Sequence, residues 1–251
     1  MTRRRWIADR MEGGDRAFLL GTNAVHLARV LRAKPGQQFD IATPDAVRSG
    51  TIVSITPELV EFALGALIES SAEMEIPQIN VVLSIYKFDR LEWAIEKLTE
   101  LGVAQIVPVI ARRTEPHLAK ASEKRVERWR KIAHEAAQQA RRPSAPEILE
   151  PSPLKKAVLA INVQEANVQE AEGQCVVLSE MEETATLRSV LASGRPPLTM
   201  AFGPEGGWAA EELQLFQERG WKSASLGSTI LRAETAAIAA VAIAMAELSG
   251  Y

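Results

Sequence analysis

The spacing of apolar residues along the chain changes near residue 77. Before that point, short runs with alternating or β-branched character predict strands at residues 39–42, 51–55 and 59–63. Turn-forming triplets such as Thr56-Pro57-Glu58 separate these runs, and a short helix is predicted at residues 22–32. Several short strands joined by tight turns favour a small barrel or sandwich.

From residue 77 onward, strands and helices alternate. Residues 79–85 form a continuous apolar run, apolar residues then recur at helical spacing from Leu91 to Leu101, and residues 105–110 form the next apolar run. Asp89 is the predicted N-cap of the intervening helix. This β-α-β order predicts a parallel sheet with helices on its faces, an α/β fold.

The remaining pattern extends this sheet and marks a domain boundary. Further strands are predicted at residues 158–161, 175–178, 198–202 and 224–226. Further helices are predicted at residues 122–141, 211–219 and, in an alanine-rich run, 236–246. The polar residues 69–73 predict a linker, so we divide the chain into a β-rich domain, residues 1–72, and an α/β domain, residues 73–251.

Composition places the chain among ordinary globular proteins. It has 251 residues, of which 47% are hydrophobic and 24% charged. The single cysteine, Cys175, excludes an intrachain disulfide, and its apolar neighbours predict a buried thiol. No apolar signal segment follows the basic first residues, and the uncharged run at residues 236–246 is too short to span a bilayer. We therefore expect a cytoplasmic protein with no membrane contact.

Positive charge is concentrated in two stretches of a chain whose formal net charge is -3. Residues 112–142 hold ten Lys or Arg against four Glu, a net of +6 that leaves -9 for the rest of the chain. Residues 1–10 hold four Arg against one Asp. Two basic stretches in an acidic protein indicate a local contact with a polyanion, although two solvated faces would give the same pattern.

Two glycine-containing turns are the strongest candidates for a binding site. The first, Gly203-Pro204-Glu205-Gly206-Gly207-Trp208, lies between a predicted strand and a predicted helix, and we call it the glycine turn. The second, residues 226–232, ends in Arg232 just before the alanine-rich helix, and we call it the arginine turn. Because glycine leaves backbone N–H and C=O groups accessible, two such turns in one half of a chain can border one pocket.

Other common sites are missing from the sequence. His134-Glu135-Ala136-Ala137-Gln138 begins like a zinc-protease helix but has Gln where the second histidine ligand belongs. With three His and one Cys in the chain, we expect no metal site. There is no GxxxxGK[ST] loop and no GxGxxG after a strand, which weakens nucleotide-hydrolase and dinucleotide-oxidoreductase interpretations.

Five motifs occur in order along the chain. The two main motifs are Gly203-Pro204-Glu205-Gly206-Gly207 and Leu226-Gly227-x-x-Ile230-Leu231-Arg232-x-Glu234-Thr235-Ala236. Supporting motifs begin at His26, Glu96 and Glu135, so the five together cover nearly the whole chain. In these motifs the chain resembles a known family, the bacterial RsmE-type methyltransferases of the SPOUT superfamily, which modify N3 of a uridine in 16S ribosomal RNA.

The resemblance implies a fold and partners that spacing alone does not. It implies a SPOUT-type parallel sheet whose C-terminal part forms a trefoil knot, and an N-terminal PUA-like RNA-binding barrel. It also implies S-adenosylmethionine as cofactor, 16S rRNA within the small ribosomal subunit as partner, and a homodimer. One departure from the family is Ala209, where a hydroxyl residue usually caps the next helix; we expect Glu211 and Glu212 to compensate partly through the helix dipole.

The resemblance also assigns candidate catalytic residues. A cation near the uracil carbonyl oxygens would stabilise the base after it loses its N3 proton, and Arg232 is our candidate for this role. The alternative for Arg232 is a structural ion pair with Glu234 or Glu205. Glu234 is a candidate proton acceptor, and a helix-capping role for it is left open.

Candidate binding residues follow from the same matches. The predicted cofactor-binding residues are Leu178, Phe202, Gly203, Pro204, Glu205, Gly206, Gly207, Leu226, Gly227, Ile230, Leu231 and Thr235. The predicted RNA-binding residues are Arg3, Arg4, Arg5, His26, Arg29, Arg32, Arg112, Arg113, Arg141 and Arg142. His26 fits a packed histidine at a domain interface equally well.

Two alternatives to a uridine-N3 methyltransferase stay open at this point. One is a SPOUT methyltransferase acting on tRNA ribose. The other is an RNA-binding or ribosome-assembly protein that keeps the fold without catalysis, although the intact glycine turns argue against it.

Overall fold

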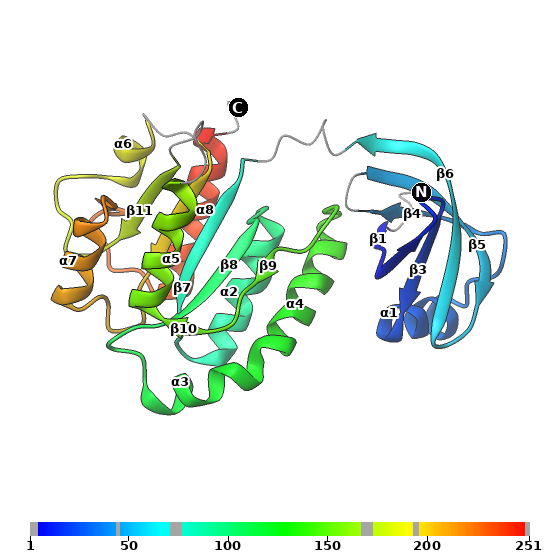
Figure 1. The fold of residues 1–251 in the computed structure, drawn as a ribbon, viewed down its shortest axis with the longest axis horizontal. Coiled ribbons are helices and arrows are strands. Elements are labelled where there is room, and N and C mark those ends of the chain that lie inside the picture. The colour runs from blue at the N-terminus through cyan, green and yellow to red at the C-terminus, as the bar shows by residue number, and fades with distance from the viewer. Residues whose placement is uncertain (1–4, 44–45, 71–76, 167–172, 193–195, 249–251) are drawn as a thin grey trace. The chain divides into compact units, whose positions relative to one another are not determined.

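The chain divides into two compact units, each described by itself (Figure 1). A computed structural model describes residues 5–43, 46–70, 77–166, 173–192 and 196–248. Unit 1 comprises Met1–Glu75 with Ala137–Ala145, and unit 2 comprises Ile76–Ala136 with Pro146–Tyr251. The boundary predicted near residue 72 lies outside the described residues, and residues 137–145, which the sequence-based division gave to the second domain, belong to unit 1.

Unit 1 is built on a six-stranded sheet. Its order is β1 (Arg5–Ile7), β4 (Gln38–Ala42), β5 (Ala46–Ile55), β6 (Leu59–Ser70), β3 (Arg16–Leu20) and β2 (Arg10–Glu12). Only β1 and β4 pair in parallel. The three strands predicted here are confirmed and are longer than predicted. Strands β1 to β3 were missed because arginines and acidic residues interrupt their apolar pattern.

The core of unit 1 packs against this sheet and against the helical segment at residues 21–30. Trp6, Leu19 and Phe62 are among its buried side chains. The predicted helix at residues 22–32 is observed as α1 (Gly21–Val25) followed by a π-helical turn at His26–Val30, whose Leu27 is buried in the same core.

A segment from later in the chain completes unit 1. Ala137 packs in a small buried cluster with Ile7, Ala42 and Val47. Arg5 donates a hydrogen bond from Nη1 to the backbone carbonyl of Arg141. Unit 1 therefore depends on residues more than 60 positions beyond its last strand for part of its packing.

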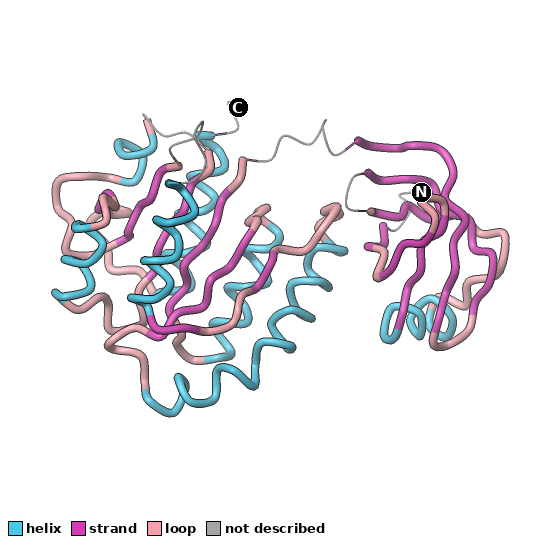
Figure 2. The backbone as a smooth tube through the Cα atoms, viewed as in Figure 1, coloured by secondary structure: helices cyan, strands magenta, loops and turns pink. Residues whose placement is uncertain are grey.

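Unit 2 contains the predicted parallel sheet. Its order is β10 (Ser152–Pro153), β8 (Gln105–Ile110), β7 (Ile79–Ser84), β12 (Leu198–Phe202), β11 (Gln174–Leu178) and β13 (Lys222–Ala224), with β9 (Glu147–Ile148) also paired to β8. Every pairing is parallel. The central strands are buried on both faces, which explains their continuous apolar runs. Helices flank the sheet on its faces (Figure 2).

The helices of unit 2 correct three predictions. They are α2 (Phe88–Glu100), α3 (Pro116–Ser122), α4 (Val126–Gln139), α5 (Leu154–Ala166), α6 (Leu187–Leu191), α7 (Ala210–Glu218) and α8 (Ala233–Leu248). The helix predicted at residues 122–141 is confirmed as α4, but it begins later than predicted, because a 3-10 turn at Glu123–Arg125 separates α3 from α4. The N-cap of α2 is Lys87, and Asp89 lies in its first turn.

The strand predicted at residues 158–161 is also wrong, because these residues belong to α5. Leu154, Ala157 and Val158 are buried and Ile161 packs against the same cluster, which is helical spacing. A short apolar run cannot by itself distinguish a buried helix from a buried strand. Among the described residues, no helix is long and apolar enough to cross a membrane.

Candidate functional site

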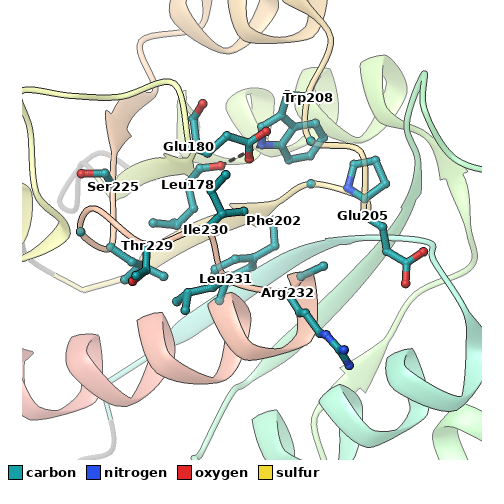
Figure 3. Close-up of a pocket in the computed structure, with 18 of the residues that line it drawn as sticks. Leu178, Glu180, Phe202, Glu205, Trp208, Ser225, Thr229, Ile230, Leu231 and Arg232 are labelled. Atoms are coloured by element: carbon teal, nitrogen blue, oxygen red, sulfur yellow. Dashed lines mark hydrogen bonds between the residues drawn. The ribbon is translucent and has the colours of Figure 1, made fainter.

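A pocket of about 440 Å³ opens at the carboxyl edge of the parallel sheet (Figure 3). Parallel strands end at the same edge, so the segments that follow β7, β11, β12 and β13 meet there. The glycine turn follows β12 and the arginine turn follows β13. The two turns that the sequence singled out therefore border one cavity.

Most predicted cofactor-binding residues line this pocket. They are Leu178, Phe202, Gly203, Pro204, Glu205, Gly207, Leu226, Gly227, Ile230 and Leu231. Gly206 and Thr235 are not among the lining residues, and Ala233 and Ala236 line it from α8 instead. Arg232, the candidate cation, also lines the pocket.

The glycine turn is held in place by Trp208. Its indole Nε1 donates a hydrogen bond to the carbonyl of Leu178, at 3.0 Å, which joins the turn to the end of β11. The ring lies against Phe216 with a centroid distance of 5.0 Å in an edge-to-face arrangement. A Cβ atom at Gly203 would lie 3.3 Å from the indole, so glycine allows the turn to pack closely on this ring.

Gly207 lines the pocket, as predicted for a cofactor-binding residue, and it also shapes the turn. Its φ is +70°, and a Cβ atom there would lie 2.3 Å from Oε1 of Glu180. Glu180 also lines the pocket. Glycine at this position therefore allows a left-handed backbone and leaves room for a carboxylate at the pocket wall, in addition to lining the cavity itself.

Side chains from neighbouring loops hold the far side of the glycine turn. Arg113 donates from Nη1 to the carbonyl of Gly206 at 2.5 Å. Glu212 accepts from the backbone N–H of Ala209 at 2.9 Å and from that of Arg112 at 2.7 Å. Glu212 thus supplies half of a capping box to α7, a direct hydrogen bond where we had expected only a dipole effect.

The arginine turn has no comparable support. Its residues from Gly227 to Arg232 are exposed, and Ile230 is 87% exposed. In the described part of the chain, no side chain of this turn makes a hydrogen bond or ion pair. The guanidinium of Arg232 is therefore an unpaired cation at the pocket wall.

Arg90 of α2 takes the carboxylates that were considered as partners of Arg232. Its Nη1 lies 2.5 Å from Oε1 of Glu205, and its Nε lies 3.9 Å from Oε1 of Glu234. Arg90 lines the pocket, whereas Glu234 does not and is only 5% exposed. The structural ion pair is thus made by Arg90, and the burial of the Glu234 carboxylate disfavours the direct contact with a substrate that we predicted for it.

Tyr86 lies beside this cluster. It is 2% exposed, and its Oη has no hydrogen-bond partner among the described residues. Burial, and then the charges of Glu234 and Glu205, raise the pKa of the phenol, so it stays neutral at physiological pH.

The sequence analysis missed several lining residues. Lys87, Arg90, Ser179, Glu180 and Trp208 line the pocket without having been proposed as site residues. Lys87 follows β7 closely, and Ser179 directly follows β11. Their position after predicted parallel strands was the available signal, since ligands bind at the carboxyl ends of such strands.

Four of the predicted RNA-binding arginines are exposed, namely Arg29, Arg32, Arg112 and Arg141. Arg113 is exposed too, and its guanidinium donates a hydrogen bond to the Gly206 carbonyl of the glycine turn. Arg3 and Arg4 lie outside the described residues.

The other three predicted RNA contacts are packed. Arg5 is 6% exposed and pairs with Glu69 at 2.6 Å, and Arg142 is 9% exposed, where burial lowers its pKa to about 10. The burial of Arg5 and Arg142 disfavours the phosphate contacts that we predicted for them. His26 is half-buried and packs edge-on against Trp6, within unit 1.

Comparison with known proteins gives a consistent result. A family model described as an RNA methyltransferase domain matches residues 73–245. The chain is 29% identical to "Ribosomal RNA small subunit methyltransferase E" of Bacillus subtilis, over 89% of this chain and 87% of that protein. It is 30% identical to the protein of the same name from Mycobacterium bovis, over 91% of this chain and 85% of that protein.

Solved structures agree. A ribosomal RNA small subunit methyltransferase E from Neisseria gonorrhoeae, bound to S-adenosyl methionine, has a TM-score of 0.78 and 25% identity, with 98% of each chain covered. A methyltransferase from Legionella pneumophila, in complex with the cofactor SAM, has a TM-score of 0.80 and 26% identity, with 98% of each chain covered. This chain belongs to the RNA methyltransferase family that includes ribosomal RNA small subunit methyltransferase E.

Proposed function

We propose that this protein uses S-adenosylmethionine to methylate N3 of a uridine in 16S ribosomal RNA. The observation that carries the proposal is the position of Arg232, a cation with no ion-pair partner among the described residues, in a pocket bordered by both family motifs. Relatives that are named small-subunit rRNA methyltransferases support the substrate class. The similar structure that was solved with bound S-adenosyl methionine supports the cofactor.

The residues of the pocket fit this cofactor. A volume of about 440 Å³ lies in the range of small-ligand sites. Leu178, Leu226 and Leu231 offer apolar surface for a base, and the carboxylate of Glu180 offers an acceptor for hydroxyl groups. These residues would hold the cofactor, which when bound supplies a methyl group activated by a positively charged sulfur.

The chain's own residues must then favour the deprotonated base. Uridine N3 carries a proton at neutral pH, and after its loss negative charge spreads to the flanking carbonyl oxygens. A guanidinium at the wall of a partly enclosed pocket stabilises that charge more than water does once the bound substrate has ordered its side chain. We assign this role to Arg232, which no carboxylate among the described residues neutralises.

Methyl transfer to defined ribosomal particles tests the proposal. Protein, labelled S-adenosylmethionine and small subunits lacking this modification would be combined, and the RNA digested to nucleosides. We expect the label in 3-methyluridine. Label in a ribose-methylated nucleoside would contradict the proposed target, and the absence of both label and cofactor binding would favour a non-catalytic RNA-binding protein.

The exposed arginines extend the proposal to RNA binding. Arg29, Arg32 and Arg141 in unit 1 and Arg112 in unit 2 are exposed and suit phosphate contacts. Each lost contact should weaken RNA binding and reduce the dependence of affinity on salt. Replacing Arg29 and Arg32 together with Ala, and measuring affinity for subunits at several salt concentrations, tests this; an unchanged salt dependence would contradict it.

The finer fold and assembly are also part of the proposal. We infer a PUA-like barrel in unit 1, a trefoil knot in the C-terminal part of unit 2, and a homodimer. The homodimer is supported by the apolar exposed side of α8, with Ala242, Ile243 and Ala246, and by Trp93 on the adjoining α2, which is 47% exposed. Light scattering of the purified protein should give twice the chain mass, and Ile243→Glu should lower it; a monomer would contradict the assembly.

A further inference from the structure

An arginine with two carboxylates connects three elements around the pocket. Glu205 comes from the glycine turn, Arg90 from α2, and Glu234 from the first turn of α8. Arg90 lies between the two acids, at 2.5 Å from Glu205 and 3.9 Å from Glu234. No motif in the sequence points to Arg90, and the proposed reaction does not use it.

Burial makes the two ends of this cluster unequal. The side chain of Glu234 is 6% exposed, and its Oε2 has no hydrogen-bond partner among the described residues. Glu205 is about a third exposed and lines the pocket. The buried Glu234 therefore attracts the guanidinium of Arg90, and this guanidinium pairs with the more exposed Glu205 at the pocket wall.

Glu205 would otherwise be a competitor for Arg232. Both residues line the same pocket, and Arg232 has no carboxylate partner in the described structure. A carboxylate released from Arg90 would be attracted to the other cations that line the pocket, among them Arg232. An ion pair there would neutralise Arg232, and the negative charge of Glu205 would oppose the charge that develops on the base.

We propose that Arg90 is a positioning residue that keeps Arg232 available for the substrate by holding Glu205 away from it. This inference rests on the proposed function, because the charge of Arg232 matters only if it serves the reacting base. It also explains why the cluster contains two acids and one arginine: Glu234 fixes Arg90, and Arg90 fixes Glu205.

The inference predicts a rescue that a simple structural tie does not. Arg90→Gln should lower kcat about 30-fold, a part of the effect of losing the cation. Adding Glu205→Gln to that variant should restore most of the loss, because the competing charge is gone. If Arg90 only tied α2 to the glycine turn, or touched the substrate itself, the double variant would be as slow as the single one.

Turnover would be measured with saturating S-adenosylmethionine and small subunits, with wild-type protein in parallel and calorimetry reporting cofactor affinity. Arg90→Lys, which keeps the charge, should stay within about threefold of wild type if charge pairing is what matters. Wild type without label transfer would refute the proposed function itself. Active wild type with an unrescued double variant, or with a fully active Arg90→Gln, would refute the role of Arg90 alone.

Arg90→Gln leaves Glu234 as a buried carboxylate without its cation and could fail to fold. A second background removes that charge. In Arg90→Gln/Glu234→Gln, Glu205→Gln is again expected to raise kcat, and no increase there would overturn the inference. Thermal unfolding of each variant shows that the compared proteins are folded.

Discussion

The glycine turn and the arginine turn border the same pocket, but the structure supports them in opposite ways. Trp208 ties the glycine turn to β11, Arg90 pairs with its Glu205, and Arg113 binds its Gly206 carbonyl. The arginine turn is exposed from Gly227 to Arg232, and within the described residues its side chains have no polar partners. The glycine turn is therefore held in place without a ligand, whereas the side chains of the arginine turn remain available for contacts with one.

This difference indicates different roles for the two turns in ligand binding. A turn fixed by several independent contacts can hold a cofactor at a small cost in conformational entropy. An exposed turn with an unpaired cation can adjust to a substrate, and the apolar Ile230 and Leu231 gain most if a ligand or a second subunit covers them. Substitutions in the glycine turn should therefore affect stability, and substitutions in the arginine turn should affect activity and binding.

The largest effect is expected from Arg232→Ala. Loss of this cation should lower kcat about 100- to 1,000-fold, while the free energy of unfolding and the cofactor affinity change little. Arg188→Ala is a suitable control, since Arg188 is an exposed arginine of the same unit, 82% exposed and paired with Glu247. Turnover, calorimetry and denaturant unfolding of both variants check this; equal turnover in the two would remove Arg232 from the mechanism.

Gly207→Ala should have the next largest effect, and on stability. A φ of +70° predicts a loss of about 1–2 kcal/mol in the free energy of unfolding, while the exposed Glu180 carboxylate can move away from the added Cβ atom. Gly206→Ala is the matched control, because its Cβ would lie 3.4 Å from Arg113 Cδ, an ordinary contact, and should cost less than about 0.5 kcal/mol. Similar unfolding free energies for both would show that the strain argument is wrong.

Trp208→Phe keeps an aromatic ring and removes one hydrogen bond. The carbonyl of Leu178 loses its indole donor, and we expect a loss of about 1 kcal/mol in the free energy of unfolding. Cofactor affinity should fall as well, since the hydrogen bond joins the two strand ends that border the pocket. Denaturant unfolding and calorimetry measure the two effects, and a variant with unchanged values in both would mean that the ring alone holds the turn.

The smallest effect on stability is expected from Ile230→Ser, because Ile230 is 87% exposed. The free energy of unfolding should change by less than about 0.5 kcal/mol. Cofactor affinity should nevertheless fall several-fold if this side chain is covered when the ligand binds. Val53→Ser, at an exposed apolar position of unit 1, should change neither quantity. Identical cofactor affinities for the two variants would argue that Ile230 stays uncovered.

Much of the sheet could be predicted, because its evidence is local. The apolar runs at β7, β8, β11 and β12 mark strands buried on both faces, and glycines mark the turn after β12. The helix α5 could not be recognised, since its four-residue apolar run fits either element. The first strands of unit 1 were missed for the opposite reason, because charged residues interrupt them.

The site was predictable where it rests on the turns and not where it rests on pairing. Gly203 and Arg232 could be identified from the chain and the family resemblance. The partner of Glu205 could not, because Arg90 lies 115 residues earlier and meets it only through the order of the sheet. The burial of two RNA-binding candidates could not be predicted for the same reason. Arginine is usually exposed, but Arg5 and Arg142 lie inside the fold.

The participation of Ala137–Ala145 in unit 1 has a consequence for biosynthesis. A growing chain emerges from its N-terminus, so the strands of unit 1 are available long before the segment that completes their packing. Until residue 145 has been made, Ile7, Ala42 and Val47 lack Ala137, and Arg5 lacks the Arg141 carbonyl. The first unit to begin folding is therefore finished only after more than half of the protein has been translated.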